Sequence, residues 1–417
     1  MTTLRTSKTM AALAIAGLLT TACGGGGGGG ADGERGADGS VTLNWSMWAS
    51  GDAEQKAWQQ VADAVTAADP TIKVKLETSP FNDYFTKMST RVSSNSAPCI
   101  VSMQSLRIGQ YTEGLLPLDD LATKNSLDLA DFDKSIVEGL SVDGRKYALP
   151  YDVGPVIMTY NKTRFREAGV PEPRVGWTIA EFEDAAKKLT GGSRYGFVGQ
   201  PLDLWMYPMV YSQSGALPVT DGKLQLTNPT LVSGVQWYAD LTAKQKVSPQ
   251  LAGTDAAFAE NQFIAGTAAM GANGPWSLLA VRSKAQFDLG LATIPAGPNG
   301  TRTLSAGSGF GISKNCKAPE EAYKAITLMT SAQTLGKLGA EGRAFPARKS
   351  VQQSWYDNAK IPSAREVLDA AAASATSFRT TKDWAKVSKL TDQYAIPVFN
   401  GQSTAQDALS TIQKQAG

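Results

Sequence analysis

The sequence predicts an α/β fold in which parallel strands alternate with helices. Residues 41–48 alternate apolar and polar side chains, which is the period of a half-buried strand. A segment with helical spacing follows over 57–68, and a second alternating segment covers 72–76. Strand, helix and strand in this order favour an open parallel sheet with right-handed crossovers. The length of 417 residues, 42% of them apolar, suits two domains or one large one.

These early segments have clear ends. The first strand presents an apolar side chain at every second residue over 41–47 and ends at Trp48. The helix repeats an apolar residue every three or four positions and stops at Asp69-Pro70, because proline disfavours a helical conformation in the residue before it. Residues 100–103 are again mostly apolar and predict a further strand.

Three later helices are marked by their first residues. Thr178 and Glu181 form a capping box, in which each side chain satisfies a free backbone donor, and apolar positions continue to Leu189. Pro319 followed by two glutamates opens another helix, since acids are favoured at the positive end of the helix dipole. A last helix is expected to begin near Ser403.

The composition excludes several function classes. There are 40 Lys and Arg against 38 Asp and Glu, and without Arg5 and Lys8 the chain from Cys23 is neutral, whereas a nucleic-acid binder should be basic. The sequence contains no histidine. Catalysis by Ser-His-Asp or Cys-His groups and histidine metal sites are therefore excluded. We expect no metal, no cofactor and no nucleic acid.

The amino terminus has the features of an export signal. Two basic residues precede the apolar run 10–19, which is too short to span a bilayer, so residues 1–22 are interpreted as a signal peptide. Small residues before Cys23 resemble the site at which bacterial lipoproteins are cleaved and acylated. The match is imperfect, because Thr20 stands where leucine is usual, and ordinary cleavage after Ala22 stays open.

Residues 23–40 are interpreted as a lipidated cysteine followed by a tether. Seven glycines follow Cys23, and the rest of the segment has too little apolar surface to fold. If Cys23 carries a lipid, Cys99 and Cys316 are left as an even pair. In an oxidising exterior they can form a disulfide, or they can remain two separate buried thiols; the sequence leaves both open.

Several motifs resemble those of the extracellular solute-binding proteins that deliver sugars to bacterial ABC importers, the family of the maltose-binding protein. The motifs are GRKYALPYD (144–152), MTYNK (158–162), GWTIAEF (176–182), FIAGTAAM (263–270), GPW (274–276), GFGIS (309–313) and PEEA (319–322). The resemblance covers nearly all of the chain after Ser40 and depends on the order and spacing of the motifs rather than on any single one.

The resemblance implies two α/β lobes that close like a hinge on a ligand between them. The first lobe would comprise 41–149 and 304–350, and the second 150–303 and 351–417. Cys99 and Cys316 would then share the first lobe. The family also implies the function: the protein would deliver a carbohydrate to an ABC permease and would not be an enzyme. We expect it to be a monomer, anchored by its lipid to the outer face of the cell membrane.

A sugar site needs aromatic rings for the apolar faces of the sugar and polar side chains for its hydroxyls. Trp48 stands at the carboxyl end of the first strand, where open α/β sheets bind ligands, so a ligand contact and a core position are both open; Trp45, within the strand, is expected in the core. Tyr151 and Asp152 fall where the chain first crosses between the lobes, and we expect them to bind ligand.

Further candidates come from loops and from family position. Trp276 follows a run of turn-forming residues, which favours a ligand contact over a core position. Trp205 can stack on the ligand or fill the second lobe. Tyr84, Gln104 and Arg343 are hypotheses from family position alone, and Arg343 can equally make a surface ion pair. Trp177 precedes a helix cap and is expected to be structural.

Two rival functions use similar residues. An exported glycoside hydrolase would need two carboxylates at a fixed separation, which the sequence spacing does not exclude, but no hydrolase motif is present. A binding protein of the same fold for another solute is the second rival. A metal is disfavoured without histidine, and a phosphate ester would need clustered Arg or Lys. Carbohydrate binding is therefore the leading hypothesis, with the sugar unnamed.

Overall fold

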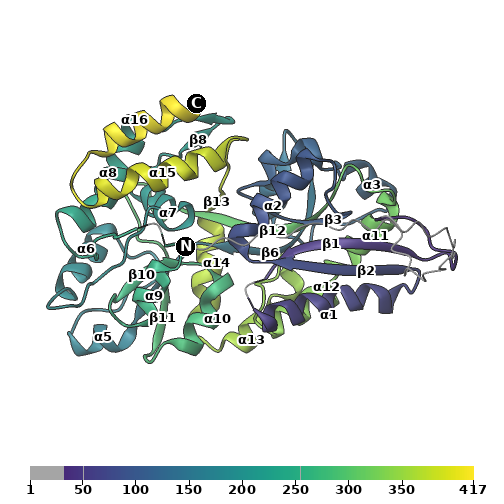
Figure 1. Ribbon diagram of the computed structural model, residues 1–417. Coiled ribbons are helices and arrows are strands. Elements are labelled where there is room, and N and C mark those ends of the chain that lie inside the picture. The colour runs from purple at the N-terminus through teal and green to yellow at the C-terminus, as the bar shows by residue number, and fades with distance from the viewer. Residues whose placement is uncertain (1–31, 50, 254) are drawn as a thin grey trace, which may run out of the picture.

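The computed structural model describes residues 32–49, 51–253 and 255–417. These residues form two lobes side by side, joined by strands that pass between them (Figure 1). Within those residues, none of the helices is long and apolar enough to span a bilayer. The predicted signal peptide, Cys23 and the glycine run lie outside the described residues.

The first lobe is built on a six-stranded sheet of order β13-β12-β3-β1-β2, with β6 paired to β12. β1 is parallel to β2 and to β3, which confirms the parallel arrangement predicted for these strands. β12 is antiparallel to β3 and β6, so the sheet as a whole is mixed. The strands are β1 Val41–Trp48, β2 Ile72–Ser79, β3 Ile100–Gln104, β6 Ala148–Pro155, β12 Thr303–Ile312 and β13 Ala375–Ser377.

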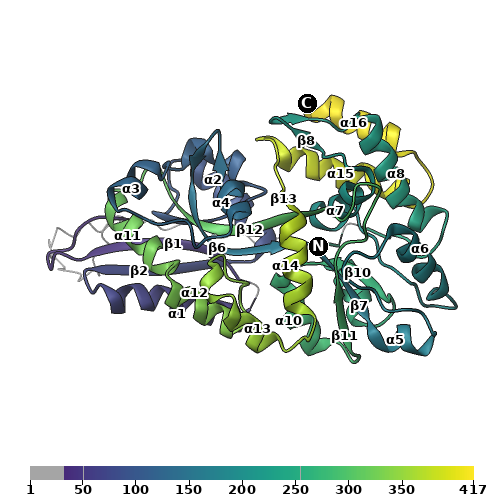
Figure 2. The ribbon, with the colours of Figure 1, turned by 180° about the vertical axis from the view of Figure 1, so that it is seen from behind.

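Helices cover both faces of this sheet. In both views α1 and α12 lie on one face and α2 on the other, and Figure 2 shows α4 beside α2 (Figures 1 and 2). The helices are α1 Asp52–Ala68, α2 Phe81–Ser93, α3 Asp119–Lys124, α4 Lys134–Gly139, α11 Pro319–Met329, α12 Ala332–Ala340, α13 Gln353–Ala359 and α14 Ala364–Ser374. Shorter elements are η1 Ile108–Gln110, η2 Thr112–Gly114, η3 Lys349–Val351, β4 Ser141–Val142 and β5 Arg145–Lys146.

The second lobe is mainly helical around a small antiparallel sheet of order β10-β7-β11. Its strands are β7 Ile157–Asn161, β10 Met270–Asn273 and β11 Leu289–Ala292, with a hairpin of β8 Val219–Thr220 and β9 Lys223–Leu224. Its helices are α5 Lys162–Glu167, α6 Ile179–Lys188, α7 Asp203–Ser214, α8 Pro229–Ala243, α9 Phe258–Ile264, α10 Pro275–Lys284, α15 Trp384–Phe399 and α16 Ala405–Ala416.

The helix starts predicted from capping signals are confirmed. Thr178 and Glu181 make both hydrogen bonds of the capping box at the start of α6. α11 has proline in its first turn, followed by two glutamates. α16 begins at Ala405, where the Thr404 side chain accepts a hydrogen bond from a backbone N–H in the first turn.

Two large hydrophobic cores mark the lobes, and the chain passes between them three times. On β6, Val153 belongs to the first core and Val156 to the second. On β12, Leu304 belongs to the second core and Phe310 to the first. The third passage follows α14, because Phe378 again packs in the second core. Three side-by-side connections between the lobes restrict their relative motion to that of a hinge.

The division of residues between the lobes differs from the sequence analysis after residue 350. We expected residues 351–417 in the second lobe, but Trp355 of α13 and Val367 of α14 are buried in the first core. The Trp355 ring packs edge-on against Phe345, with ring centroids 5.2 Å apart. Burial of this large aromatic surface holds α13 on the first lobe.

The described part of the predicted tether, residues 32–40, packs on the first lobe. The Asp32 carboxylate accepts hydrogen bonds from the backbone N–H of Asn44 at 2.8 Å and of Cys99 at 2.7 Å. The expectation that the segment lacks the means to fold is corrected here, because hydrogen bonds between the Asp32 carboxylate and the backbone of the first lobe take the place of apolar burial. Cys99 is joined to Cys316 by a disulfide beside this segment.

Candidate functional site

A pocket of about 660 Å³ lies between the lobes. The first lobe contributes the start of α2 and the segment that follows β3. The second lobe contributes residues 201–205 at the start of α7, residues 255–257 and the middle of α15. α2 and α15 face each other across the space between the lobes (Figure 1). The volume falls within the range of small-molecule sites, and two bodies that can move apart form its walls.

Aromatic rings enter this pocket from both lobes. Trp205, half-buried on α7, lines the second-lobe wall and packs against the second core. Phe81, the first residue of α2, lines the opposite wall. Trp48 packs edge-on behind Phe81, with ring centroids 5.6 Å apart. Of the predicted aromatic residues, Trp205 therefore reaches the pocket directly, and Trp48 supports a residue that does.

Charged groups provide both hydrogen-bond acceptors and a donor. The Asp203 carboxylate accepts from Trp384 Nε1 at 2.9 Å and from Ser388 Oγ at 3.2 Å, and burial raises its pKa. Burial also raises the pKa of Asp392, with a further contribution from the negative charge of Asp203. Burial lowers the pKa of Arg107, whose guanidinium lies 4.5 Å from the centre of the Phe85 ring.

Arg107 and Asp392 differ from Asp203 in having no hydrogen bond from their side chains to the described residues. Both line the pocket, as does Gln104 at the end of β3. A charged group in a partly dry pocket gains most from a ligand that offers the complementary donor or acceptor. The pocket can therefore bind a ligand that carries both, such as a polyol.

A second group of candidate residues lies where the chain crosses between the lobes. Asp152 on β6 accepts a hydrogen bond from the backbone N–H of Ser308 on β12, at 2.6 Å. Burial raises the pKa of Asp152 to about 7, although the Ser308 hydrogen bond and the charge of Arg343 oppose this rise. The carboxyl group of Asp152 is thus held between two crossing strands.

Arg343 pairs with Glu54 at the start of α1, with Nη1 and Oε1 separated by 3.3 Å. Its guanidinium also lies 5.9 Å from the centre of the Trp58 ring. The ion pair expected as one alternative for Arg343 is present. The buried Nε–H of Arg343 has no partner among the described residues.

Trp276 packs against the second core at the start of α10 and lies over the crossing strand β6. A β-carbon on Gly154 of that strand would come within 2.9 Å of the Trp276 ring, so the strand can pass only because glycine has no side chain. Trp276 therefore belongs with Asp152 and Arg343, called here the crossing group, rather than to the pocket.

Tyr84 and Tyr151 lie in the first core. Tyr84 is 1% exposed, and its hydroxyl lies within hydrogen-bond distance of the carbonyls of Ser46 and Ser102. Tyr151 stacks on Phe310 with ring centroids 4.8 Å apart. The structure does not bring these two tyrosines to the pocket, because the sheet of the first lobe uses both rings for packing.

The deciding comparison is with family models. Residues 48–335 match the model of bacterial extracellular solute-binding proteins. The chain belongs to this family. The two-lobe fold that the sequence resemblance implied is confirmed by solved structures of the same kind.

Individual solute-binding relatives match this chain over most of its length. The diacetylchitobiose binding protein DasA of Streptomyces coelicolor is 26% identical over 96% of both chains. The maltooligosaccharide ABC transporter solute-binding lipoprotein of Streptococcus pneumoniae is 22% identical over 82% of this chain and 81% of its own. The substrate-binding protein Lmo0181 of Listeria monocytogenes, solved with cycloalternan, is 26% identical with a TM-score of 0.80, over 90% of this chain and 98% of that one.

Among the residues of the pocket in this solute-binding protein that sequence reasoning missed are Phe81, Arg107, Asp203 and Asp392. Phe81 follows β2, and Arg107 follows β3 by three residues, so both stand near the carboxyl ends of parallel strands. The rule that drew attention to Trp48 could have found them. Asp203 and Asp392 have no comparable signal, because they lie on helices of the second lobe that only the fold brings together.

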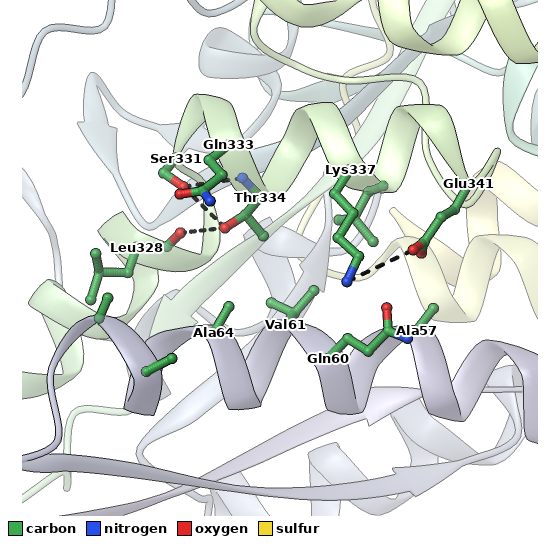
Figure 3. Close-up of a pocket in the computed structure, with 13 residues that line it drawn as sticks. Ala57, Gln60, Val61, Ala64, Leu328, Ser331, Gln333, Thr334, Lys337 and Glu341 are labelled. Carbon is green, nitrogen blue, oxygen red and sulfur yellow. Dashed lines mark hydrogen bonds and ion pairs between the residues drawn. The ribbon is translucent and has the colours of Figure 1, made fainter.

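A second hollow, of about 590 Å³, lies outside the cleft (Figure 3). Its lining comes from α1, the end of α11 and α12, all in the first lobe. Alanines of α1 form much of its floor, and the ion pair of Lys337 with Glu341, at 3.9 Å, lies at one end. Because only one lobe lines this groove, closure of the lobes would not enclose a ligand there.

Proposed function

We propose that this protein is the substrate-binding component of an ABC importer and captures a carbohydrate between its lobes. The observation that carries the proposal is the interlobe pocket, because both lobes supply an aromatic ring and polar groups to it. Membership of the solute-binding family and the sugars named for its relatives support a carbohydrate as the ligand.

In this proposal, Trp205 and Phe81 pack on the apolar C–H faces of the sugar. Arg107 and Gln104 donate hydrogen bonds to sugar hydroxyls, and Asp203 and Asp392 accept them. Two of these charged side chains have no competing hydrogen bond from the described residues, so the ligand does not have to displace a protein partner.

The crossing group has a different role in the proposal. Asp152, Arg343 and Trp276 contact the end of the sugar nearest the crossing strands. Because Asp152 is hydrogen-bonded to Ser308 on a second crossing strand, a ligand that binds its carboxyl group interacts with both strands of the hinge. Ligand contact here favours one arrangement of the lobes over others.

The proposal extends to transport. The protein acts as a monomer without a cofactor, breaks no bond in the sugar, and presents the closed form to the membrane permease of the importer. Residues 1–22 direct export, and a lipid on Cys23 holds the protein on the outer face of the cell membrane. The name of the Streptococcus pneumoniae relative as a lipoprotein supports the anchor.

Thermal unfolding with a sugar panel tests the proposal. The purified protein is heated alone and with diacetylchitobiose, maltotriose and galactooligosaccharides, and each mixture is checked for new products. A ligand at about a thousandfold its Kd stabilises the folded state by about 4 kcal/mol, a shift of several degrees. A shift without product supports sugar capture. A processed sugar would indicate a glycoside hydrolase, and no shift with any sugar would favour another solute.

A further inference from the structure

Helix α10 belongs to both lobes at once. Its second residue, Trp276, packs against the second core, whereas Leu278 is fully buried in the first core. The helix follows β10 of the second lobe and contacts the crossing strand β6. α10 and α13 come together near the bottom of the junction between the lobes in both views (Figures 1 and 2). α10 is therefore an interlobe contact in addition to the three chain crossings.

Leu279 seats this helix on a glycine of the first lobe. A β-carbon added at Gly342, just beyond the end of α12, would collide with Leu279 Cδ1. Gly342 also has a φ of 71°, a conformation that residues with side chains rarely adopt. The Leu279 side chain thus occupies the space that only glycine leaves open, which fixes the position of α10 against the turn after α12.

Arg282, one turn further along α10, caps a helix of the first lobe. Its Nη1 donates to the carbonyl of Asn358 at 3.1 Å and to the carbonyl of Ala359. These are the last carbonyls of α13, where no backbone donor is available and the helix dipole favours a positive charge. Asn358 in turn donates from Nδ2 to the carbonyl of Ala340 at 2.8 Å, which joins the ends of α12 and α13.

The contact made by Leu279 and Arg282, called here the α10 contact, lies next to the crossing group. Trp276 is three residues before Leu279 on the same helix, and Arg343 directly follows Gly342. A displacement of α10 from Gly342 would therefore move a ring that packs on β6 and disturb the backbone that carries the Arg343 guanidinium.

We infer that Leu279 and Arg282 are positioning residues that hold the lobes in the arrangement that forms the interlobe pocket. They control ligand affinity from outside the pocket, since a ligand that binds one arrangement binds more weakly when that arrangement is less populated. The effect on affinity rests on the proposed function, whereas the effect on lobe arrangement does not.

The lobe arrangement is measured first, without ligand. Spin labels at Lys87→Cys and Lys187→Cys, both exposed and one on each lobe, report the interlobe distance by pulsed electron resonance. Arg282→Ala and Leu279→Ala should each broaden the distance distribution and shift it to longer values. Arg282→Lys, which keeps a donor for one carbonyl, should restore much of the original distribution. Unfolding temperatures identify any variant that is merely destabilised.

The matched control is Arg166→Ala, because Arg166 pairs with Asp288 within the second lobe. This variant should leave the interlobe distance unchanged. Folded Arg282→Ala and Leu279→Ala proteins with the distribution of the unmodified chain would overturn the inference, whatever the affinity for sugar.

Affinity is then measured by calorimetry with diacetylchitobiose, or with the sugar that gives the largest thermal shift. Arg282→Ala should weaken binding about tenfold, and Arg282→Lys less. A shifted distance with unchanged or tighter binding would overturn the claim that the α10 contact holds the binding arrangement. If the unmodified protein binds no sugar, the proposed function fails, and the distance measurement still decides the inference.

Discussion

The two groups of candidate residues differ in what already occupies their polar atoms. In the pocket, Arg107 and Asp392 have no side-chain hydrogen bonds to the described residues, and Trp205 is half-buried. At the crossing strands, Asp152 is hydrogen-bonded to Ser308, and Arg343 is paired with Glu54. Ligand binding therefore adds new interactions in the pocket, whereas at the crossing it modifies existing ones. We expect the pocket to supply affinity and the crossing to couple binding to lobe arrangement.

The largest expected effect concerns the protonation of Asp152. Its pKa in the folded protein is about 7, above the unfolded value near 3.8, so the folded state binds the proton more tightly. The stability of the protein relative to an Asp152→Asn variant should therefore fall by up to about 4 kcal/mol as the pH rises from 4 to 7. Chemical unfolding of both proteins across this range measures the difference. A constant difference would mean that Asp152 does not titrate there.

The next effect is on affinity in the pocket. Trp205→Ala should weaken sugar binding about a hundredfold, because it removes a large ring that stacks on the ligand. Calorimetry with the stabilising sugar measures it. Trp237→Ala is the matched control, since Trp237 is a half-buried tryptophan of α8 whose Nε1 donates to Glu183 outside the pocket. Equal losses of sugar affinity in the two variants would mean that Trp205 does not contact the sugar.

A smaller effect is expected at Asp392. Asp392→Ala should weaken binding about tenfold, the cost of one charge-assisted hydrogen bond. The unfolding temperature should change little, because the side chain makes no hydrogen bond to the described residues. Asp63→Ala, which removes an exposed aspartate of α1, should leave binding unchanged. A destabilised Asp392→Ala protein with normal affinity would mean that Asp392 stabilises the fold and does not bind the ligand.

The smallest effect is expected at Gln104. Gln104→Ala should weaken binding about threefold, since a neutral hydrogen bond to a ligand contributes about half of what a charged one does. The same calorimetric titration checks this. A loss as large as that of Trp205→Ala would mean that the donor at the end of β3, rather than the ring, dominates the pocket.

The regular parts of the fold could be predicted because their signals are local. The alternation over 41–47 depends only on side chains of one strand, and the capping box at Thr178 depends on four residues. The place of α13 in the first lobe depends instead on Trp355 meeting Phe345 across a turn. No periodicity within α13 indicates which of two cores will receive its apolar face.

The site was only partly predictable for a similar reason. Tyr151 and Asp152 are neighbours on one strand and point to opposite faces, so at most one of them could face a ligand. The sequence does not reveal which face lies on the core. On α2, Phe81 and Tyr84 are one turn apart, yet Phe81 reaches the pocket and Tyr84 is enclosed by β1 and β3.

The most direct test of the account is a structure of the protein with the sugar that stabilises it most. The account predicts a sugar ring between Phe81 and Trp205, with hydroxyls within hydrogen-bond distance of Arg107 and Asp392. A sugar bound in the groove between α1 and α12, or on the crossing strands without contact to Trp205, would contradict it.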